Sequence, residues 1–235
     1  MILSINQPAY LPWPGYFERI QLADLHVELD HVQFEKNSFV NRNRLRSPDG
    51  WCWLTVPIKT RSRFGQLPIN ECETSEDGRW RRKHWNTLQN FYRKALFFGE
   101  YAAFFEALWQ KPWPKVIDLL RESNSYLMNV LGITTPVVIS SERSWSCAKS
   151  ELVLEICKNH GATTYLSGEM GRDYLDLPAF EQAGIEVRFH AFTPFEYRQC
   201  FQGFEGGLSV LDALMNMGQD VSNHMRTCIR SLPTQ

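Results

Sequence analysis

The amino-acid sequence predicts a single α/β domain over residues 1–235, with a mostly parallel sheet of the Rossmann-like layered type and a helical insertion at about residues 78–131. Short apolar runs alternate with helix-length segments near both ends of the chain, which is the pattern of parallel strands joined by right-handed crossovers. Between these regions, three helical segments follow one another. A length of 235 residues with 43% hydrophobic side chains is enough for a sizeable core.

The N-terminal region begins the α/β pattern. Residues 2–5 form a short apolar run, and the three prolines in residues 8–16 exclude a helix or an inner strand there. We expect a helix at about residues 16–23 and a second strand at residues 25–29, where apolar and polar side chains alternate with period two. A strand, a helix and a strand in this order predict a parallel pair.

The middle of the chain predicts a long loop, a strand and three helices. Residues 33–50 are polar, basic and rich in turn-forming residues, so we interpret them as a loop, and loops of this length are usually functional. Residues 51–58 have the apolar and aromatic composition of a strand. Helices are expected at about residues 78–97, 101–109 and 114–131.

After residue 132 the α/β pattern becomes regular again. The tail beyond Gly218 has weak periodicity, so we expect it to be poorly ordered. We expect strands at residues 136–140, 163–166 and 185–189, and helices at residues 149–160, 178–183 and 209–217.

Charge is distributed unevenly. Residues 36–94 hold 13 of the 25 basic residues but only five acidic ones, which gives that segment a net charge of +8 and leaves −9 for the rest. Such a segment attracts phosphates, nucleotides or nucleic acid, unless folding spreads its charges over a solvated surface. Trp51 and Trp53, with Trp80 and Trp85, are interleaved with these charges, which suggests a stacking platform, although helical tryptophans are more often core residues. A pI near 6.6 argues against a protein devoted to nucleic acid.

The sequence carries no signal for export or for a membrane. No basic and apolar leader begins the chain, and no window approaches the roughly 18 uninterrupted apolar residues of a membrane span. The six cysteines are far apart and include no CxxC pair, which favours reduced thiols. We therefore expect a cytoplasmic protein without membrane insertion; its oligomeric state is left open.

Polar and basic side chains follow the predicted second strand. Asp30 and His31 lie at its carboxyl end, where ligands bind in open α/β sheets. Lys36, Arg42 and Arg44 are suited to phosphate contacts, since lysine supplies a point charge and arginine a bidentate fork. The alternative is a basic surface loop.

If this segment is extended, alternate residues point to opposite sides. Arg42 and Arg44 then face one anion, while Asn41 and Asn43 face the other way and tie the segment down. Asn41 also offers an amide to a ligand.

Two further positions are candidates. The turn after the strand at residues 163–166 contains Ser167 and Gly168, which can offer a hydroxyl and backbone N–H groups to an anion, although a simple strand-to-helix turn explains it equally well. His84 lies in the positive segment, where cations lower the pKa of an imidazole and favour the neutral form that a general base needs. No histidine pair has metal-ligand spacing, so we expect no metal and no resident cofactor.

Several short segments spread over nearly the whole chain form a recognisable pattern. They are residues 7–17 (QPAYLPWPGYF), 30, 32–34 (VQF), 41–43 (NRN), 53–57 (WLTVP), 83–84 (KH), 165–168 (YLSG), 174–175 (YL) and 209–212 (SVLD). Together they resemble the WbqC-like family, whose members occur among bacterial O-antigen and polysaccharide gene clusters. The resemblance implies a role around nucleotide-linked sugars and adds Gln7, Tyr10, Gln33 and Tyr174 to the candidate substrate-binding residues. At His31 the family pattern often has another polar or acidic residue.

Three classes of function are compatible with these observations. The first is a transferase that moves an acyl or aminoacyl group from a thioester or a charged tRNA onto a nucleotide-linked amino sugar, with His84, Asp30 or His31 as candidate catalytic residues. The second is a non-catalytic partner in a polysaccharide assembly complex. The third is an RNA-binding protein, whose affinity would fall steeply with salt.

Overall fold

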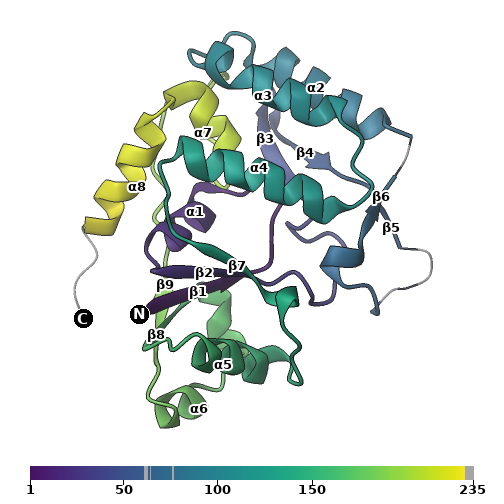
Figure 1. Cartoon of the computed structure of the whole chain (residues 1–235). Helices are drawn as coiled ribbons and strands as arrows, with labels where there is room; N and C mark the ends of the chain where they lie inside the picture. Colours follow the sequence, from purple (N-terminus) through teal and green to yellow (C-terminus); the bar gives the residue numbers. More distant parts are fainter. Residues whose placement is uncertain (61–62, 64, 76, 231–235) are drawn as a thin grey trace.

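A five-stranded, all-parallel sheet lies at the centre of the computed structural model, which describes residues 1–60, 63, 65–75 and 77–230 (Figure 1). The strands lie in the order β7-β2-β1-β8-β9, which is 3-2-1-4-5 when these five are numbered along the chain. This order confirms the predicted Rossmann-like α/β class. The strands are β1 (Ile2–Asn6), β2 (Leu25–Glu28), β7 (Val137–Ile139), β8 (Thr164–Gly168) and β9 (Glu186–His190).

One face of the sheet is apolar and is covered by α5 (Lys149–Asn159) and α6 (Leu177–Gln182) (Figure 1). The short helices η2 (Ser140–Glu142) and η3 (Glu169–Asp173) follow β7 and β8. The core on this face joins side chains of three central strands to both helices. It includes Leu3, Ile5, Val27, Tyr165, Ile156 and Phe180, all at most 5% exposed.

The opposite face carries a buried polar layer between the sheet and the helices α1 (Pro14–Gln21) and α4 (Val116–Val130). Parallel register places paired residues on the same side, so Ser4 and His26 lie next to each other and form a 2.8 Å hydrogen bond. Asn6 is paired with Glu28 in the same way. Only one face of the sheet is therefore lined by apolar side chains. The other face buries polar side chains, which need specific hydrogen-bond partners.

A large insertion separates the second and third strands of the sheet. It begins after β2, ends before β7 and contains the three predicted helices, with α4 as the last (Figure 1). These helices share a second core with α1 and with the C-terminal helices. The other elements of the insertion are β3 (Arg42–Ser47), β4 (Gly50–Thr55), β5 (Ile58–Lys59), η1 (Ile69–Glu71), β6 (Glu73–Thr74), α2 (Arg79–Tyr92) and α3 (Phe98–Gln110).

The prediction of a long loop over residues 33–50 agrees with the structure for residues 34–41 but is wrong from Arg42 on. β3 pairs with β4 in an antiparallel hairpin, with Arg42 opposite Thr55 and Ser47 opposite Gly50. The strand is hidden in the sequence because polar residues occupy both of its faces. The buried Asn43 satisfies its side chain through a 2.7 Å bond from Nδ2 to the carbonyl of Leu11, so a polar residue replaces the apolar side chain that a strand pattern requires.

The expectation of a poorly ordered tail is also wrong for most of its length. After α7 (Val210–Met217), the chain forms α8 (Asp220–Arg230), and Val221 and Met225 are fully buried in the second core. The last five residues lie outside the described ones. Within the described residues, no helix has the length and apolar character needed to cross a membrane.

Candidate functional site

A cavity of about 320 Å³ lies where the strand order of the sheet reverses. Its wall includes the carboxyl ends of β1, β8 and β9, contributed by Asn6, Ser167 with Gly168, and His190. Such a reversal is the usual ligand site of open α/β sheets, and the volume falls in the range of small-molecule sites. Other lining residues are Ile5, Trp13, Gly15, Arg19, Tyr165, Glu169, Met170, Gly171, Tyr174 and Phe192.

Arg19 is a buried cation on this cavity. Its residue is 8% exposed, and its Nη2 donates to the Oδ1 of Asn6. Among the described residues, no carboxylate pairs with its guanidinium, and its Nε has no hydrogen-bond partner. Burial lowers the pKa of Arg19, which reports how poorly the site solvates its charge. A buried charge without a counter-ion is costly, so this arrangement is suited to an anionic ligand.

Two glycines let the backbone approach the cavity closely. A Cβ atom on Gly168 would overlap the guanidinium of Arg19. A Cβ atom on Gly15 would lie 2.5 Å from the ring of Phe192, which is closer than any ordinary contact. The requirement for Gly168 therefore comes from the space that Arg19 occupies.

His190 forms the second polar feature of the cavity. Its Nε2 lies 2.9 Å from the Oε1 of Glu18, and the two residues are 7% and 2% exposed. The other carboxylate oxygen, Oε2, has no partner in the described part of the chain. An imidazole held by a buried carboxylate is an arrangement that can accept a proton and stabilise the resulting cation.

Asp30 lies outside this cavity, in a network at the carboxyl ends of β2 and β7. Arg121 donates to its Oδ2 over 2.8 Å and also pairs with Glu28, at 2.7 Å. Ser140 and Ser141 complete the set, with the Oγ of Ser141 2.7 Å from the Oδ2 of Asp30. Burial raises the pKa of Glu28, and Arg121 opposes that shift. Asp30 is 1% exposed, and its carboxylate accepts four hydrogen bonds, three from side chains and one from the N–H of Ser141, which are the surroundings of a structural carboxylate.

His31 is attached to the same network but is more accessible. Its Nδ1 lies 2.7 Å from the Oγ of Ser140, and its ring stacks on Trp145 with 6.5 Å between centroids. Burial lowers the pKa of His31, and the charge of Asp30 opposes the shift. The predicted catalytic roles of Asp30 and His31 stay predictions.

His84 and Tyr10 contact each other deep in the second core. The Tyr10 hydroxyl lies 2.9 Å from the Nδ1 of His84 and accepts a hydrogen bond from the Nε1 of Trp109 over 2.8 Å. His84 is 1% exposed, and burial lowers its pKa to about 3. This keeps the imidazole neutral, as expected; desolvation is the main cause of the lowered pKa, and the nearby cation that the sequence argument invoked, Lys83, makes a smaller contribution. A substrate would reach neither side chain without a rearrangement of the core.

The remaining predicted residues hold the backbone or face solvent. Gln33 accepts from the N–H of Leu67, and Asn41 donates to the carbonyl of Val56 over 2.8 Å. Lys36 is exposed, and Gln7 is half-buried in the loop that follows β1. Ser167, Gly168 and Tyr174 are therefore the predicted binding residues that line the cavity, and the others are distributed over separate places.

Arg42 and Arg44 share one side of β3, as the extended geometry predicts. Asn41 and Asn43 point the other way and bond to backbone carbonyls. The guanidinium of Arg42 lies over Trp53, with 4.1 Å from its Cζ to the ring centroid. The two arginines are thus grouped as expected, but on a surface of aromatic rings.

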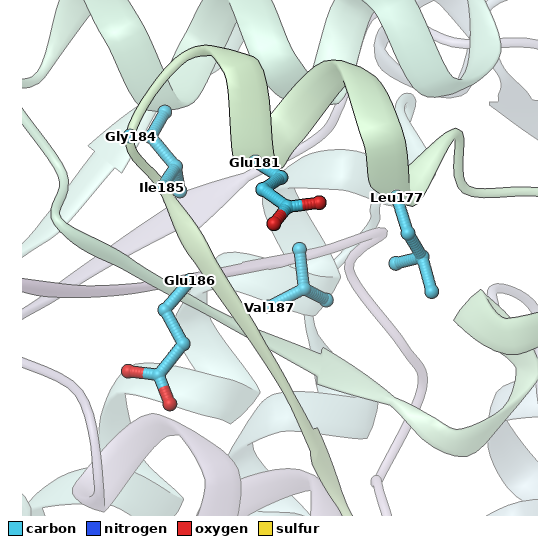
Figure 2. A pocket seen from close by; sticks show the side chains of 6 residues that line it. All are labelled: Leu177, Glu181, Gly184, Ile185, Glu186 and Val187. Carbon is cyan, nitrogen blue, oxygen red and sulfur yellow. The ribbon is translucent and has the colours of Figure 1, made fainter.

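Another hollow, of about 330 Å³, lies between α6 and β9 (Figure 2). Figure 2 shows Leu177 and Glu181 on the helix, with the Glu181 side chain toward Val187 on the edge strand and the Glu186 side chain on the other side of that strand. Its charged side chains are carboxylates, which repel the phosphate-bearing ligands that suit Arg19. Among the described residues, no group of three His, Cys, Asp or Glu side chains is placed to hold a metal ion.

Sequence reasoning missed Arg19, Glu18 and His190. His190 directly follows the strand predicted at residues 185–189, so the rule that ligands lie at the carboxyl ends of strands would have selected it. Arg19 and Glu18 are neighbours on a short helix, where adjacent opposite charges suggest a solvated surface. No local signal distinguishes such a pair from a buried one.

The fold defines an α/β protein with a cavity at the topological switch point of a Rossmann-like sheet, where open α/β sheets bind their ligands. Residues 7–224 match the model of the WbqC-like protein family, and the chain belongs to that family. It is 32% identical over 229 residues to the uncharacterized protein Rv1507c of Mycobacterium tuberculosis, covering 96% of this chain and 98% of the relative. No solved structure matches the chain with significance.

Proposed function

We propose that the cavity at the switch point binds the phosphate groups of a nucleotide-linked amino sugar, and that the protein transfers an acyl or aminoacyl group to the sugar in bacterial surface polysaccharide (O-antigen) biosynthesis. The observation that carries the proposal is Arg19, a buried guanidinium without a carboxylate partner among the described residues. A phosphate supplies the missing counter-ion and accepts a bidentate pair of hydrogen bonds. Such substrates are cytoplasmic, which is where we expect the protein to act.

Side chains around Arg19 complete the binding site in this proposal. Gly168 brings the backbone close, and Tyr174, which is 50% exposed, lines the cavity. Ser167 offers its hydroxyl, which in this structure donates to the carbonyl of Gly168 over 3.0 Å. The Nδ2 of Asn6 is buried without a partner in the described residues, so it is available to a ligand oxygen. These groups are mostly held by strand ends, which position a ligand more rigidly than a loop does.

The reaction needs one general base and one hydrogen-bond donor that stabilises the oxyanion. The amine nitrogen of the sugar attacks the acyl carbonyl carbon, the C–N bond forms, and the C–O or C–S bond of the donor breaks. His190 takes the proton from the amine and returns it to the leaving oxygen or sulfur, while Glu18 stabilises the imidazolium. Asn6 donates to the carbonyl oxygen as negative charge develops there. His190 replaces His84 as the proposed base because His190 lines the cavity.

A ligand screen tests the binding step. The purified protein is heated with nucleotide-linked sugars that differ in base and in sugar, and a tight ligand stabilises it by about 2.7 kcal/mol at a hundredfold excess over Kd. We expect stabilisation of the wild type and of Arg188→Gln, whose guanidinium pairs with Glu186 on an exposed surface, but not of Arg19→Met. Equal stabilisation of all three proteins would show that Arg19 does not bind the ligand.

Mass spectrometry of mixtures with acyl donors tests the transfer step. A new mass equal to sugar nucleotide plus acyl group is expected with wild type and is expected to be lost in His190→Ala. If sugar nucleotides bind but no donor gives a product, the protein is a non-catalytic binding partner, and the enzyme part of the proposal fails.

A further inference from the structure

Four aromatic rings form a continuous row that begins at the cavity. Trp13 lines the cavity, and its ring centroid lies 5.2 Å from that of Phe39. Phe39 lies 6.2 Å from Trp53, and Trp53 lies 5.5 Å from Trp51. Phe39 and Trp51 are 40% and 42% exposed, which is unusual for rings of this size. We call Trp13, Phe39, Trp53 and Trp51 the aromatic stripe.

Two arginines accompany the aromatic stripe along β3. The Cζ of Arg42 lies 4.1 Å from the centroid of Trp53, and that of Arg44 lies 5.1 Å from the centroid of Trp51. Each has further polar contacts, Arg42 to Asn37 and Arg44 to the carbonyl of Gly207, but the Nε of each is unpartnered among the described residues. The stripe thus combines exposed aromatic surface with positive charge, and all its rings except Trp13 lie within the segment of net charge +8.

We propose that the aromatic stripe binds the unpaired 3′ end of an aminoacylated RNA and directs its terminal ester into the cavity. Bases stack on exposed aromatic rings, and guanidinium groups meet the phosphates between them, which is how single-stranded nucleic acid is held without sequence readout. Adjacent rings are inclined by 54°, 51° and 78°. This inclination fits bases splayed apart, as in unpaired RNA, and does not fit the parallel stack of a duplex.

This inference rests on the proposed function, for which it names the donor. The sugar amine attacks the carbonyl carbon of the aminoacyl ester, the C–N bond forms, and the ester C–O bond breaks. The proton removed from the amine by His190 goes to the ribose oxygen that leaves, so the products are the aminoacylated sugar and an RNA with free terminal hydroxyls. No oxidant or further reactant is needed.

Fluorescence anisotropy with a labelled single-stranded RNA of about ten nucleotides tests the inference. We expect binding that weakens with salt, with log K falling by about 0.7 per log unit of salt for each phosphate contact, or about 1.4 for the two arginines. Trp51→Ala, at an exposed position, is expected to lower affinity about tenfold while leaving the thermal unfolding temperature nearly unchanged. A duplex of the same sequence is expected to bind more weakly.

Arg42→Gln distinguishes a specific contact from general attraction. It is expected to reduce the salt slope by about 0.7, whereas the control Arg188→Gln, at the edge strand of the sheet, is expected to leave slope and affinity unchanged. Equal binding of duplex and single strand, or identical slopes for both variants, overturns the inference. So does binding of a neutral oligosaccharide in place of RNA.

The two proposals fail separately. If sugar nucleotides still stabilise the wild type through Arg19 while the RNA does not bind, the donor is wrong and the binding proposal stands. If the RNA binds but Arg19→Met has no effect on any sugar nucleotide, the stripe stands as an RNA surface and the claim that it feeds a transferase is refuted.

Discussion

Replacing Arg19 by methionine should change the stability of the protein by no more than about 2.5 kcal/mol in either direction while abolishing ligand binding. Burying a cation costs several kcal/mol, and replacing buried charges with apolar side chains often stabilises a protein by about 1–4 kcal/mol. The substitution also removes the hydrogen bond from Arg19 to Asn6, which should destabilise the protein by about 1.5–3 kcal/mol. The net change should therefore lie between a loss of about 2 kcal/mol and a gain of about 2.5 kcal/mol.

Arg46 provides the matched control because it is as deeply buried but fully partnered. It is 4% exposed and donates to the carbonyls of Ser47, Gly50 and Gln202, each over 2.6 Å, and to the Oε1 of Gln199 over 3.2 Å. Arg46→Met leaves these acceptors unsatisfied, so we expect a loss of about 3–5 kcal/mol.

Thermal unfolding followed by circular dichroism compares the two variants. For a chain of this size, 1 kcal/mol shifts Tm by about 2–4 °C, so Arg46→Met should unfold roughly 6–20 °C earlier than the wild type. Arg19→Met should unfold close to the wild type and should lose the stabilisation by sugar nucleotides. If Arg19→Met lowers Tm as much as Arg46→Met does, the guanidinium of Arg19 is structural and the argument for an anion site is refuted.

Three further expectations follow from the buried histidines and the cavity. Burial lowers the pKa of both His26 and His84 to about 3, so the unfolded chain binds protons below about pH 6.5 that the folded chain does not, and between pH 7 and pH 5 each histidine should cost about 2 kcal/mol of stability. Urea unfolding at pH 7 and pH 5 should show that His84→Gln loses less stability between the two pH values than the wild type does. An equal loss would contradict the conclusion that His84 is buried in its neutral form. His190→Ala should lower kcat by about 10²–10⁴ with little change in KM, and Glu18→Gln should lower it less; a change in KM alone would indicate a binding role. Gly168→Ala should weaken sugar-nucleotide binding about tenfold in a calorimetric titration, because its Cβ displaces Arg19, and unchanged affinity would place the ligand elsewhere.

The fold was largely predictable because its strands and helices carry local apolar patterns. Residues 2–5 (ILSI) and 163–166 (TTYL) are short segments rich in aliphatic, β-branched and aromatic side chains, and their positions agree with β1 and β8. The β3 strand was not predictable because Asn43 takes an inward position that the strand pattern reserves for an apolar residue. A sequence pattern does not show which group a buried polar side chain will bond to. For Asn43 that group is the backbone carbonyl of Leu11, 32 residues earlier in the chain.

The candidate site was less predictable than the fold, since burial of polar groups depends on what covers them. His26 and Glu28 alternate with apolar residues, which suggests a solvent-facing side of a strand, yet they are 2% and 7% exposed. The rule about strand ends selected Ser167 and Gly168, which line the cavity, but also selected Asp30, whose side chain is occupied by structural partners. Sequence position thus identified the edge of the sheet but not which of its side chains are available.

The polar layer also has a consequence for how the molecule deforms. Hydrophobic contacts tolerate small sliding movements, whereas directional bonds such as those from His190 to Glu18 and from Arg19 to Asn6 fix the spacing between sheet and helix. The two apolar cores therefore lie on either side of a rigid polar layer. We expect slow amide exchange in both β1 and α1, the strand and the helix that this layer joins. The cavity lies at the end of this polar layer, so its shape should change little as the outer helices fluctuate. A ligand would therefore bind to a preorganised site.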